Sequence, residues 1–422
     1  MVRTHTFENG LTLLMERLPH LRSAAVGVFV KAGSIVEGKD ENGLSHFIEH
    51  MNFKGTQTLS ARQLAEEIDL LGGNVNAATS KVATSFYARV TDKDLPRAVR
   101  LLADMMVRPA ASGADFERER QVILEEIAME ADSPEDVVYN LVHKGLYGEQ
   151  TLSQTILGTR EAISSYTPEA LQAFRGRFYR PGNAVVACAG RFDEDALIAL
   201  CGEAFAQWEG MGREEYPHNE VLPGDASLAL DKDIEQAHLC LSFRGLSSSS
   251  ADRHALIALS TAFGGGVSSR LFQRVREERG LVYNIYSSPS FYPTCGEFTI
   301  YAACAPKSLD EVRGIIGSEV QSVLDAGLTD KEFTQTMAQL RTGFVLGMES
   351  AYTRMAGMAM YLLLHGKVVT PRESLAMMQK VKLPGVNRVA HDVLGGEMKL
   401  SAVGKKMSRR LGAKGVKRNG QA

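Results

Sequence analysis

Two histidines and a glutamate stand close together near the start of the chain, in the order His46, Glu49 and His50. Gly43 precedes them and no proline interrupts the residues that follow, so we expect a helix that runs to about Phe53. On such a helix His46 and His50 lie one turn apart on the same face, where two imidazoles can share one metal ion. Glu49 lies at the edge of that face, within reach of a water molecule at the metal. The alternative is an amphipathic helix whose histidines are ordinary surface or core residues.

Three protein ligands and one open position are usual for zinc in a hydrolase, so a third ligand is required. The segment 115–131 is predicted to be a helix, because it is rich in acidic residues and carries apolar residues on one side. Glu119 and Glu126 are seven residues apart and share a face of this helix. The spacing does not distinguish Glu125 from Glu126 as the ligand, and a solvated acidic helix face is the competing interpretation.

Length and composition indicate a globular protein with at least two domains. The chain has 422 residues and a mass of 46.0 kDa, which is larger than a domain built around one hydrophobic core usually is. Its net charge of -3 favours neither nucleic acid nor an anionic membrane as a partner. No apolar run approaches the ~20 residues that a membrane span needs, and the first residues do not form a secretory signal. We expect a cytoplasmic protein without nucleic-acid or membrane partners.

Cysteine usage points to a reducing compartment. The five cysteines are an odd number, are widely spaced and form no C-x-x-C pair. We expect free, buried thiols and no cysteine metal site. They are Cys188, Cys201, Cys240, Cys295 and Cys304.

The second half of the chain repeats the order of elements predicted for the first half. The apolar strand at 24–30 corresponds to 237–243, and the helix at 95–106 corresponds to 309–324. Corresponding elements of the two halves are about 214 residues apart throughout, which indicates a domain duplication. The helix at 256–263, which corresponds to the motif helix, contains no histidine or glutamate. Metal chemistry is therefore expected only in the first half.

The alternation of strands and helices predicts an α+β fold of two homologous α/β sandwich domains, each a mostly antiparallel sheet with helices packed on it. A polar segment rich in glycine separates the two halves. The expected divisions are a metal-binding domain at 1–213, a linker at 214–228, a homologous domain without a metal site at 229–404 and a basic tail at 405–422.

The motif, the glutamates about 76 residues beyond it and the duplicated halves resemble the pitrilysin/insulinase family of zinc peptidases, in particular its mitochondrial-processing-peptidase-like bacterial branch. The order H-x-x-E-H is the inverted zinc-peptidase motif. The resemblance implies a processing-peptidase-like duplication and one zinc ion per chain, with His46, His50 and Glu126 as ligands. It also implies that Glu49 is the general base of a metalloendopeptidase and that Glu119 assists catalysis.

The resemblance further implies that peptide substrates bind as an added strand beside residues 76–79, which include Asn76 and Ala77. Two positions depart from the family pattern. Asn52 stands where an apolar or small residue is usual, and Val82 stands where a glutamate is common. Neither change touches a metal ligand, but Val82 alters the expected contacts with substrate.

In the second half, Arg276 and Tyr283 match an arginine and a tyrosine that help the family bind substrate. Taken alone, their segment is a basic helix end followed by a strand. In the family, two-domain units face one another and enclose the site. Because this chain carries both sets of residues, we expect a homodimer whose chamber admits short or unfolded peptides.

Two other interpretations compete with this one. A non-catalytic structural subunit, like the core proteins of respiratory complexes, would share the fold but generally has a damaged metal motif. The lysines and arginines after residue 404 could instead bind nucleic acid. That segment is short and lacks interleaved aromatic residues, so a solvated, partly disordered end is the preferred interpretation.

Overall fold

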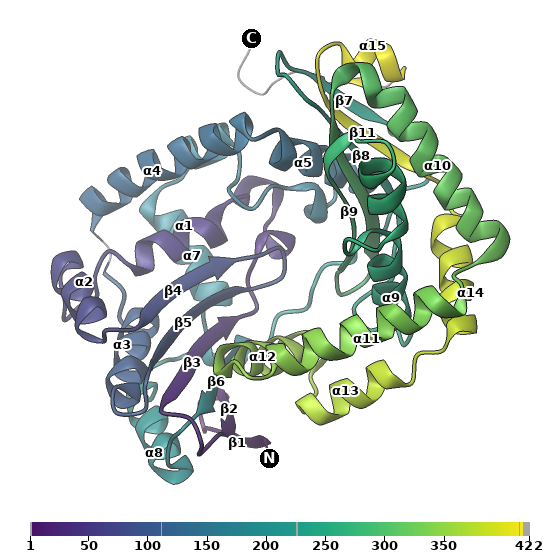
Figure 1. Cartoon of the computed structure of the whole chain (residues 1–422). Helices are drawn as coiled ribbons and strands as arrows, with labels where there is room; N and C mark the ends of the chain where they lie inside the picture. The colour runs from purple at the N-terminus through teal and green to yellow at the C-terminus, as the bar shows by residue number, and fades with distance from the viewer. Residues whose placement is uncertain (1, 111, 225–226, 413, 417–422) are drawn as a thin grey trace. The chain divides into compact units, whose positions relative to one another are not determined.

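Apolar strands pair into two mixed sheets of six strands each (Figure 1). The computed structural model describes residues 2–110, 112–224, 227–412 and 414–416. The chain forms two compact units, and each consists of three separate segments. The first unit contains residues 1–127, 155–217 and 345–374, and the second contains residues 128–154, 218–344 and 375–422.

The sheet of the first unit has the strand order β1-β2-β6-β3-β5-β4. All neighbours are antiparallel except β2 and β6, which are parallel. Strand β4 is an edge strand, and it carries the expected substrate segment. The strands are β1 (Val2–Thr6), β2 (Thr12–Arg17), β3 (Ser23–Val30), β4 (Asn74–Thr79), β5 (Thr84–Thr91) and β6 (Ala184–Gly190).

Helices cover both faces of this sheet. Side chains of α1, α3, α7 and α8 form one core with it, and α12 packs against its other face through residues that include Met355 and Met358. The helices are α1 (Leu44–Asn52), α2 (Ala61–Leu70), α3 (Leu95–Val107), α6 (Arg160–Ser165), α7 (Pro168–Phe178), α8 (Glu194–Ala204) and α12 (Ala351–His365). Helix α4 (Gly113–Asp132) begins in this unit and continues into the second.

The sheet of the second unit has the order β12-β7-β11-β8-β10-β9. Its strands are β7 (Leu228–Asp231), β8 (Ala237–Arg244), β9 (Val282–Phe291), β10 (Gly296–Cys304), β11 (Lys399–Gly404) and β12 (Lys414–Gly415). Helices α9, α10 and α14 share its main core, and α5 packs against β8 and β11. The helices are α5 (Pro134–Tyr147), α9 (Arg253–Gly264), α10 (Leu309–Ala326), α11 (Asp330–Gly347), α13 (Pro371–Gln379), α14 (Leu383–Leu394) and α15 (Met407–Leu411), with a π-helix at Phe272–Glu277.

The two sheets have the same order when strands are matched along the chain, with β12 in the position of β1. This correspondence confirms the predicted duplication and the predicted α/β sandwich, in which antiparallel pairs predominate. The repeat also includes a helix exchange. Helix α5 lies in the first half of the sequence but belongs to the second unit, and α12 shows the reverse relation. The compact units therefore differ from the contiguous divisions expected from the sequence, because each sheet has one face covered by a helix from the other half of the chain.

The structure describes the basic tail at residues 405–412 and 414–416, where Lys405, Lys406, Arg409 and Arg410 are exposed, as expected for a solvated segment. Met407 is fully buried, Ser408 donates to Asp231, and β12 extends the sheet beside β7. Burial of one apolar residue and strand pairing therefore attach this segment to the second unit, although its basic side chains face solvent. Residues 417–422 lie outside the described residues.

All five cysteines are free and buried, as predicted. Within the part of the chain that the structure describes, no helix has the length and apolar character needed to cross a membrane.

Candidate metal centre and active site

Helix α1 begins at a position that only glycine adopts easily. Gly43 has φ 99°, and a side chain there would meet the backbone of residues 157 and 158. Because glycine has no side chain to cap the helix, the buried carboxylate of Glu37 takes this role. It accepts hydrogen bonds from the backbone N–H groups of Gly43 and Ser45, both at 2.8 Å, and from the Asn42 amide at 3.1 Å. The start of the motif helix is thereby fixed in direction.

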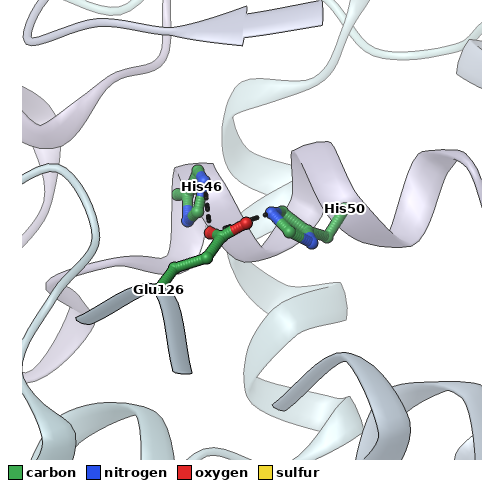
Figure 2. A group of neighbouring side chains, drawn as sticks. All are labelled: His46, His50 and Glu126. Carbon is green, nitrogen blue, oxygen red and sulfur yellow. Dashed lines mark ion pairs between the residues drawn. The ribbon is translucent and has the colours of Figure 1, made fainter. Parts of the chain in front are cut away.

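Both motif histidines face Glu126 of α4 (Figure 2). The distance from Glu126 Oε2 to His46 Nε2 is 3.6 Å, and the distance to His50 Nε2 is 3.4 Å. Among the described residues this is the one group of three potential ligands, with atoms within 4.8 Å of one another. The structure thus brings together His46, His50 and Glu126, whereas the neighbouring Glu125 is exposed.

The donor set fits a zinc ion. Zinc–ligand bonds of about 2.0 Å in a tetrahedron separate the ligand atoms by roughly 3.3 Å, close to the two distances found here. Burial and the neighbouring His50 lower the pKa of His46 to about 3, which keeps its imidazole neutral, as a ligand must be. His46 Nδ1 is buried and has no hydrogen-bond partner among the described residues.

Glu119 holds the second histidine from behind. Its Oε2 lies 3.0 Å from His50 Nδ1, so this nitrogen donates to the carboxylate when Nε2 faces a metal. Its Oε1 lies 2.7 Å from Lys54 Nζ, and its side chain is almost fully buried. A carboxylate in this position fixes both the tautomer and the orientation of the histidine ring.

Glu49 points toward the edge strand. Its Oε2 accepts a hydrogen bond of 2.5 Å from Thr79 Oγ1, at the end of β4. Burial raises the pKa of Glu49, and the hydrogen bond from Thr79 partly opposes this shift. A carboxylate next to the three potential ligands but not part of their group is placed to accept a proton and to release it again.

Replacing Glu37 by alanine is expected to lower the stability of the first unit by about 2 kcal/mol, because two buried N–H groups at the start of α1 lose their acceptor. Thermal unfolding monitored by circular dichroism measures the effect. Asp40→Ala is the control, because Asp40 is exposed and lies in the same loop. Equal unfolding temperatures for the two variants would contradict the capping role.

The edge strand β4 has the expected substrate segment in the expected place. Asn76 pairs with Tyr87 and Ala77 with Phe86, and no described strand of the sheet pairs with the other side of β4. Asn76 Oδ1 accepts from the backbone N–H of Ala77 at 2.8 Å. Val82 lies in the turn between β4 and β5, and its carbonyl accepts from Tyr216 Oη at 2.8 Å.

Arg276 and Tyr283 lie in the second unit and contact one another. The Arg276 guanidinium carbon is 5.0 Å from the centre of the Tyr283 ring and 4.7 Å from that of Phe272. The Tyr283 side chain is 78% exposed, which is unusual for an aromatic residue. The pair therefore offers a cationic and a phenolic group to an external ligand.

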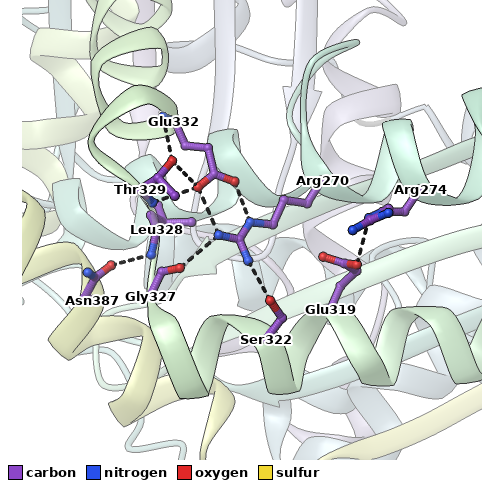
Figure 3. Close-up of polar contacts among 9 residues, drawn as sticks. All are labelled: Arg270, Arg274, Glu319, Ser322, Gly327, Leu328, Thr329, Glu332 and Asn387. Atoms are coloured by element: carbon purple, nitrogen blue, oxygen red, sulfur yellow. Dashed lines mark hydrogen bonds and ion pairs between the residues drawn. The ribbon is translucent and has the colours of Figure 1, made fainter.

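Arg270 anchors the segment that carries Arg276 (Figure 3). Its guanidinium forms a two-pronged ion pair with Glu332, at 2.5 and 2.9 Å, and donates to the Gly327 carbonyl at 2.9 Å. These contacts tie the residues before the π-helix to the turn between α10 and α11.

The Arg270–Glu332 ion pair makes the free energy of unfolding depend on pH. Hydrogen bonds from Arg270 and Thr329 lower the pKa of Glu332 to about 2 despite its partial burial. The pair contributes about 1–2 kcal/mol to the free energy of unfolding, after allowance for solvent exposure. This contribution is complete above the ordinary pKa of a glutamate and is lost as pH falls from about 4.5 to 2. We expect Glu332→Gln to lower the unfolding temperature at pH 6, and the difference from wild type to shrink by pH 3. A difference that does not change with pH would contradict this account.

The helix that corresponds to α1 in the second unit is α9. It begins at Arg253 and so includes His254, one turn earlier than the range expected from the sequence. No glutamate or second histidine accompanies His254 on this helix. Of these two equivalent helices, only α1 carries two of the potential metal ligands, His46 and His50.

Three contacts of the site were not found from the sequence. Glu37 caps α1 from outside the motif, Thr79 donates to Glu49 from the edge strand, and Lys54 pairs with Glu119. Lys54 follows the motif closely and Thr79 lies in the expected substrate strand, but a role for either depends on strand and helix packing. No sequence signal marks Glu37 among the other acidic residues of its loop.

The chain matches two protein-family models and several known proteins. The family described as Insulinase (Peptidase family M16) matches residues 12–160, and the Peptidase M16 inactive domain matches residues 165–340. The chain is 38% identical over 409 residues to a protein of Mycobacterium leprae named as an uncharacterized zinc protease, covering 96% of this chain and 92% of the relative. It is 36% identical to zinc protease YmxG of Bacillus subtilis, covering 96% and 98%.

Solved structures show the same fold. A protease from Helicobacter pylori matches with a TM-score of 0.88 and 23% identity, covering 96% of this chain and 99% of the other. A chain of complex III2 from Candida albicans matches with a TM-score of 0.83 and 19% identity, covering 96% of each. The family matches over most of the chain and the relatives that are 36–38% identical to it show that the chain belongs to peptidase family M16, the insulinase family.

Proposed function

We propose that the protein is a zinc-dependent metalloendopeptidase that cleaves short or unfolded peptides. The observation that carries this proposal is the convergence of His46, His50 and Glu126, with the carboxylate of Glu49 beside them. Relatives that match over nearly the whole chain are named zinc proteases, which supports the same activity.

His46, His50 and Glu126 would hold one zinc ion per chain. When bound, such an ion polarises the scissile carbonyl and makes a water molecule acidic enough to attack it near neutral pH. Glu49 accepts the proton of the attacking water and passes it to the leaving amine. Thr79 orients the Glu49 carboxylate through its hydrogen bond, and Glu119 keeps His50 in the ligating tautomer.

Substrate is proposed to bind as an additional strand on the open side of β4. Backbone hydrogen bonds from alternate residues of the segment that contains Asn76 and Ala77 would then align an extended peptide next to Thr79, which contacts the general base. This kind of binding recognises the peptide backbone and gives little preference for its sequence.

We further propose that a homodimer completes the site. Arg276 and Tyr283 would be supplied by a second copy of the chain, where the guanidinium and the phenol can hydrogen-bond a substrate carbonyl or a developing oxyanion. The exposure of Tyr283 and its contact with Arg276 support this role. A chamber closed by two copies would exclude folded proteins.

The test of the activity is cleavage of a random peptide library by the purified protein. We expect cleavage that a chelator abolishes and that zinc restores, together with about one zinc ion per chain by elemental analysis. A protein that binds no metal after dialysis against zinc and cleaves no peptide would refute the proposal.

The test of the dimer is mixing of two inactive variants. Glu49→Gln lacks the general base, and Arg276→Ala lacks the proposed substrate contact from the second copy. If sites are shared between copies, a mixture contains heterodimers with one complete site, so activity reappears. A mixture as inactive as its components, with a monomeric mass in solution, would contradict the shared site.

A structural subunit without activity is the second candidate. The match of residues 165–340 to the inactive domain and the likeness to a chain of complex III2 favour it. The complete set of His46, Glu49, His50 and Glu126 favours the enzyme. The chelation experiment separates the two, because a structural subunit would neither bind zinc tightly nor cleave peptides.

A cytoplasmic location and the absence of a nucleic-acid partner remain part of the proposal. Cell fractionation tests the location, and RNA binding that weakens steeply with salt would contradict the second expectation.

A further inference from the structure

A cavity lies on the side of α1 that does not carry the metal group. It has a volume of about 460 Å³, which is within the range of small-molecule sites. All of the residues that line it belong to the first unit. Its apolar walls include Ile48 and Met51 of α1, Met106 of α3, Phe116 of α4, Leu171 of α7 and Trp208.

Among the polar residues that line this cavity, Asn52 and Arg175 contact one another. Asn52 is fully buried, and its Oδ1 accepts from Arg175 Nη1 at 2.6 Å, while its Nδ2 has no hydrogen-bond partner among the residues that the structure describes. A buried amide with two unused N–H bonds is costly unless a ligand accepts from it. Asn52 is also the residue that departs from the apolar or small residue usual in the family.

The hydrogen-bond acceptors found for Arg175 among the described residues are all uncharged. Among the described residues no acidic oxygen lies within salt-bridge distance of its guanidinium, and burial lowers its pKa to about 10. Its Nη2 donates to the Met106 carbonyl at 2.7 Å and more weakly to that of Met105, at the end of α3. The partial negative charge of the helix end accounts for the position of Arg175 but leaves its Nε without an acceptor in the described structure.

We propose that this cavity binds a small apolar molecule with one carboxylate group. The carboxylate would accept from Arg175 Nε and Asn52 Nδ2, and the apolar part would lie against Met51, Met106 and Trp208. Glu209 is exposed at the rim, so molecules with several negative charges are disfavoured. A fatty acid and an apolar amino acid or peptide end share this chemistry.

Binding to this site is independent of peptide cleavage, so its test does not use activity. Octanoate and N-acetyl-leucine are titrated into the zinc-loaded protein by calorimetry, with octanol as the uncharged control. We expect one site per chain with a Kd below about 1 mM for at least one acid, and weaker binding of octanol. The acid that binds more tightly identifies the source of the carboxylate.

Nuclear magnetic resonance of labelled methionine methyl groups locates the bound acid. The signals of Met51 and Met106 are expected to shift, whereas that of Met358, which packs on the other face of the sheet, is not. Shifts confined to methionines outside the cavity would overturn the assignment.

The substitution Asn52→Asp places a negative charge of the protein next to Arg175. The new carboxylate would pair with Arg175 and repel the ligand, so octanoate affinity should fall by at least about tenfold. Gln236→Glu adds the same charge on an exposed loop of the second unit and should leave affinity unchanged. Asn52→Leu, which cannot donate, is a second variant should the first fold poorly, and it should also weaken binding. Unchanged affinity in both Asn52 variants, equal binding of octanol, or no binding of either acid would overturn the proposal.

Discussion

Replacing Glu49 by glutamine is expected to reduce kcat for peptide cleavage by about 10³-fold, while the bound zinc remains. Glutamine keeps an oxygen that can accept from Thr79, so the helix and the edge strand should stay in place. It cannot accept the proton of the attacking water, and the loss of a general base costs about 10²–10⁴ in rate. Activity on a quenched peptide and zinc content by elemental analysis are measured on the same sample.

The matched control is Glu66→Gln on α2, where an exposed glutamate pairs with Arg62 one turn away. This change should leave both rate and zinc content within about twofold of wild type, because exposed pairs contribute little. A Glu49→Gln enzyme that retains more than a tenth of wild-type kcat would mean that another group accepts the proton. A loss of zinc in this variant would mean instead that Glu49 binds or supports the metal.

The part of the site that depends on helix periodicity could be predicted from the sequence. Residues four apart on one helix face the same side, so the approach of His46 and His50 follows from spacing alone. The duplication was visible for a similar reason, since matching elements recur at a constant offset. The helix exchange could not be predicted from the sequence. Nothing in the order of elements shows that α5 and α12 cover sheets formed by the opposite halves of the chain.

Contacts between distant segments account for the rest. Glu37 caps α1 from six residues before Gly43, across a loop whose path is set by tertiary packing. Thr79 reaches Glu49 because β4 and α1 pack together. In the tail beyond residue 404 the basic side chains are exposed, as composition indicates, but burial of Met407 and pairing of β12 with β7 attach the segment to the sheet. In each case a favourable long-range contact outweighs a weak local preference.

Replacing Glu126 by glutamine is expected to have a large effect on zinc affinity, and the same replacement of Glu125 is its control. Both are glutamates on α4, and spacing alone left the choice between them open. In the structure Glu126 lies within 3.6 Å of both histidine Nε2 atoms, whereas Glu125 is exposed. Glu126→Gln removes the only charged ligand of the proposed set, so zinc affinity should fall by at least about 100-fold, the upper range for loss of a residue that merely supports a ligand.

Competition with a chelator of known affinity measures this change, and peptide cleavage at fixed free zinc should fall with it. Glu125→Gln carries the same chemical change one residue away and should alter neither quantity beyond about twofold. Because the two variants have the same composition and the same net charge, a general electrostatic effect would change both alike. Loss of zinc in Glu125→Gln but not in Glu126→Gln would require α4 to be rotated by about one residue from the position found here, and the relation between Glu119 and His50 would then have to change with it.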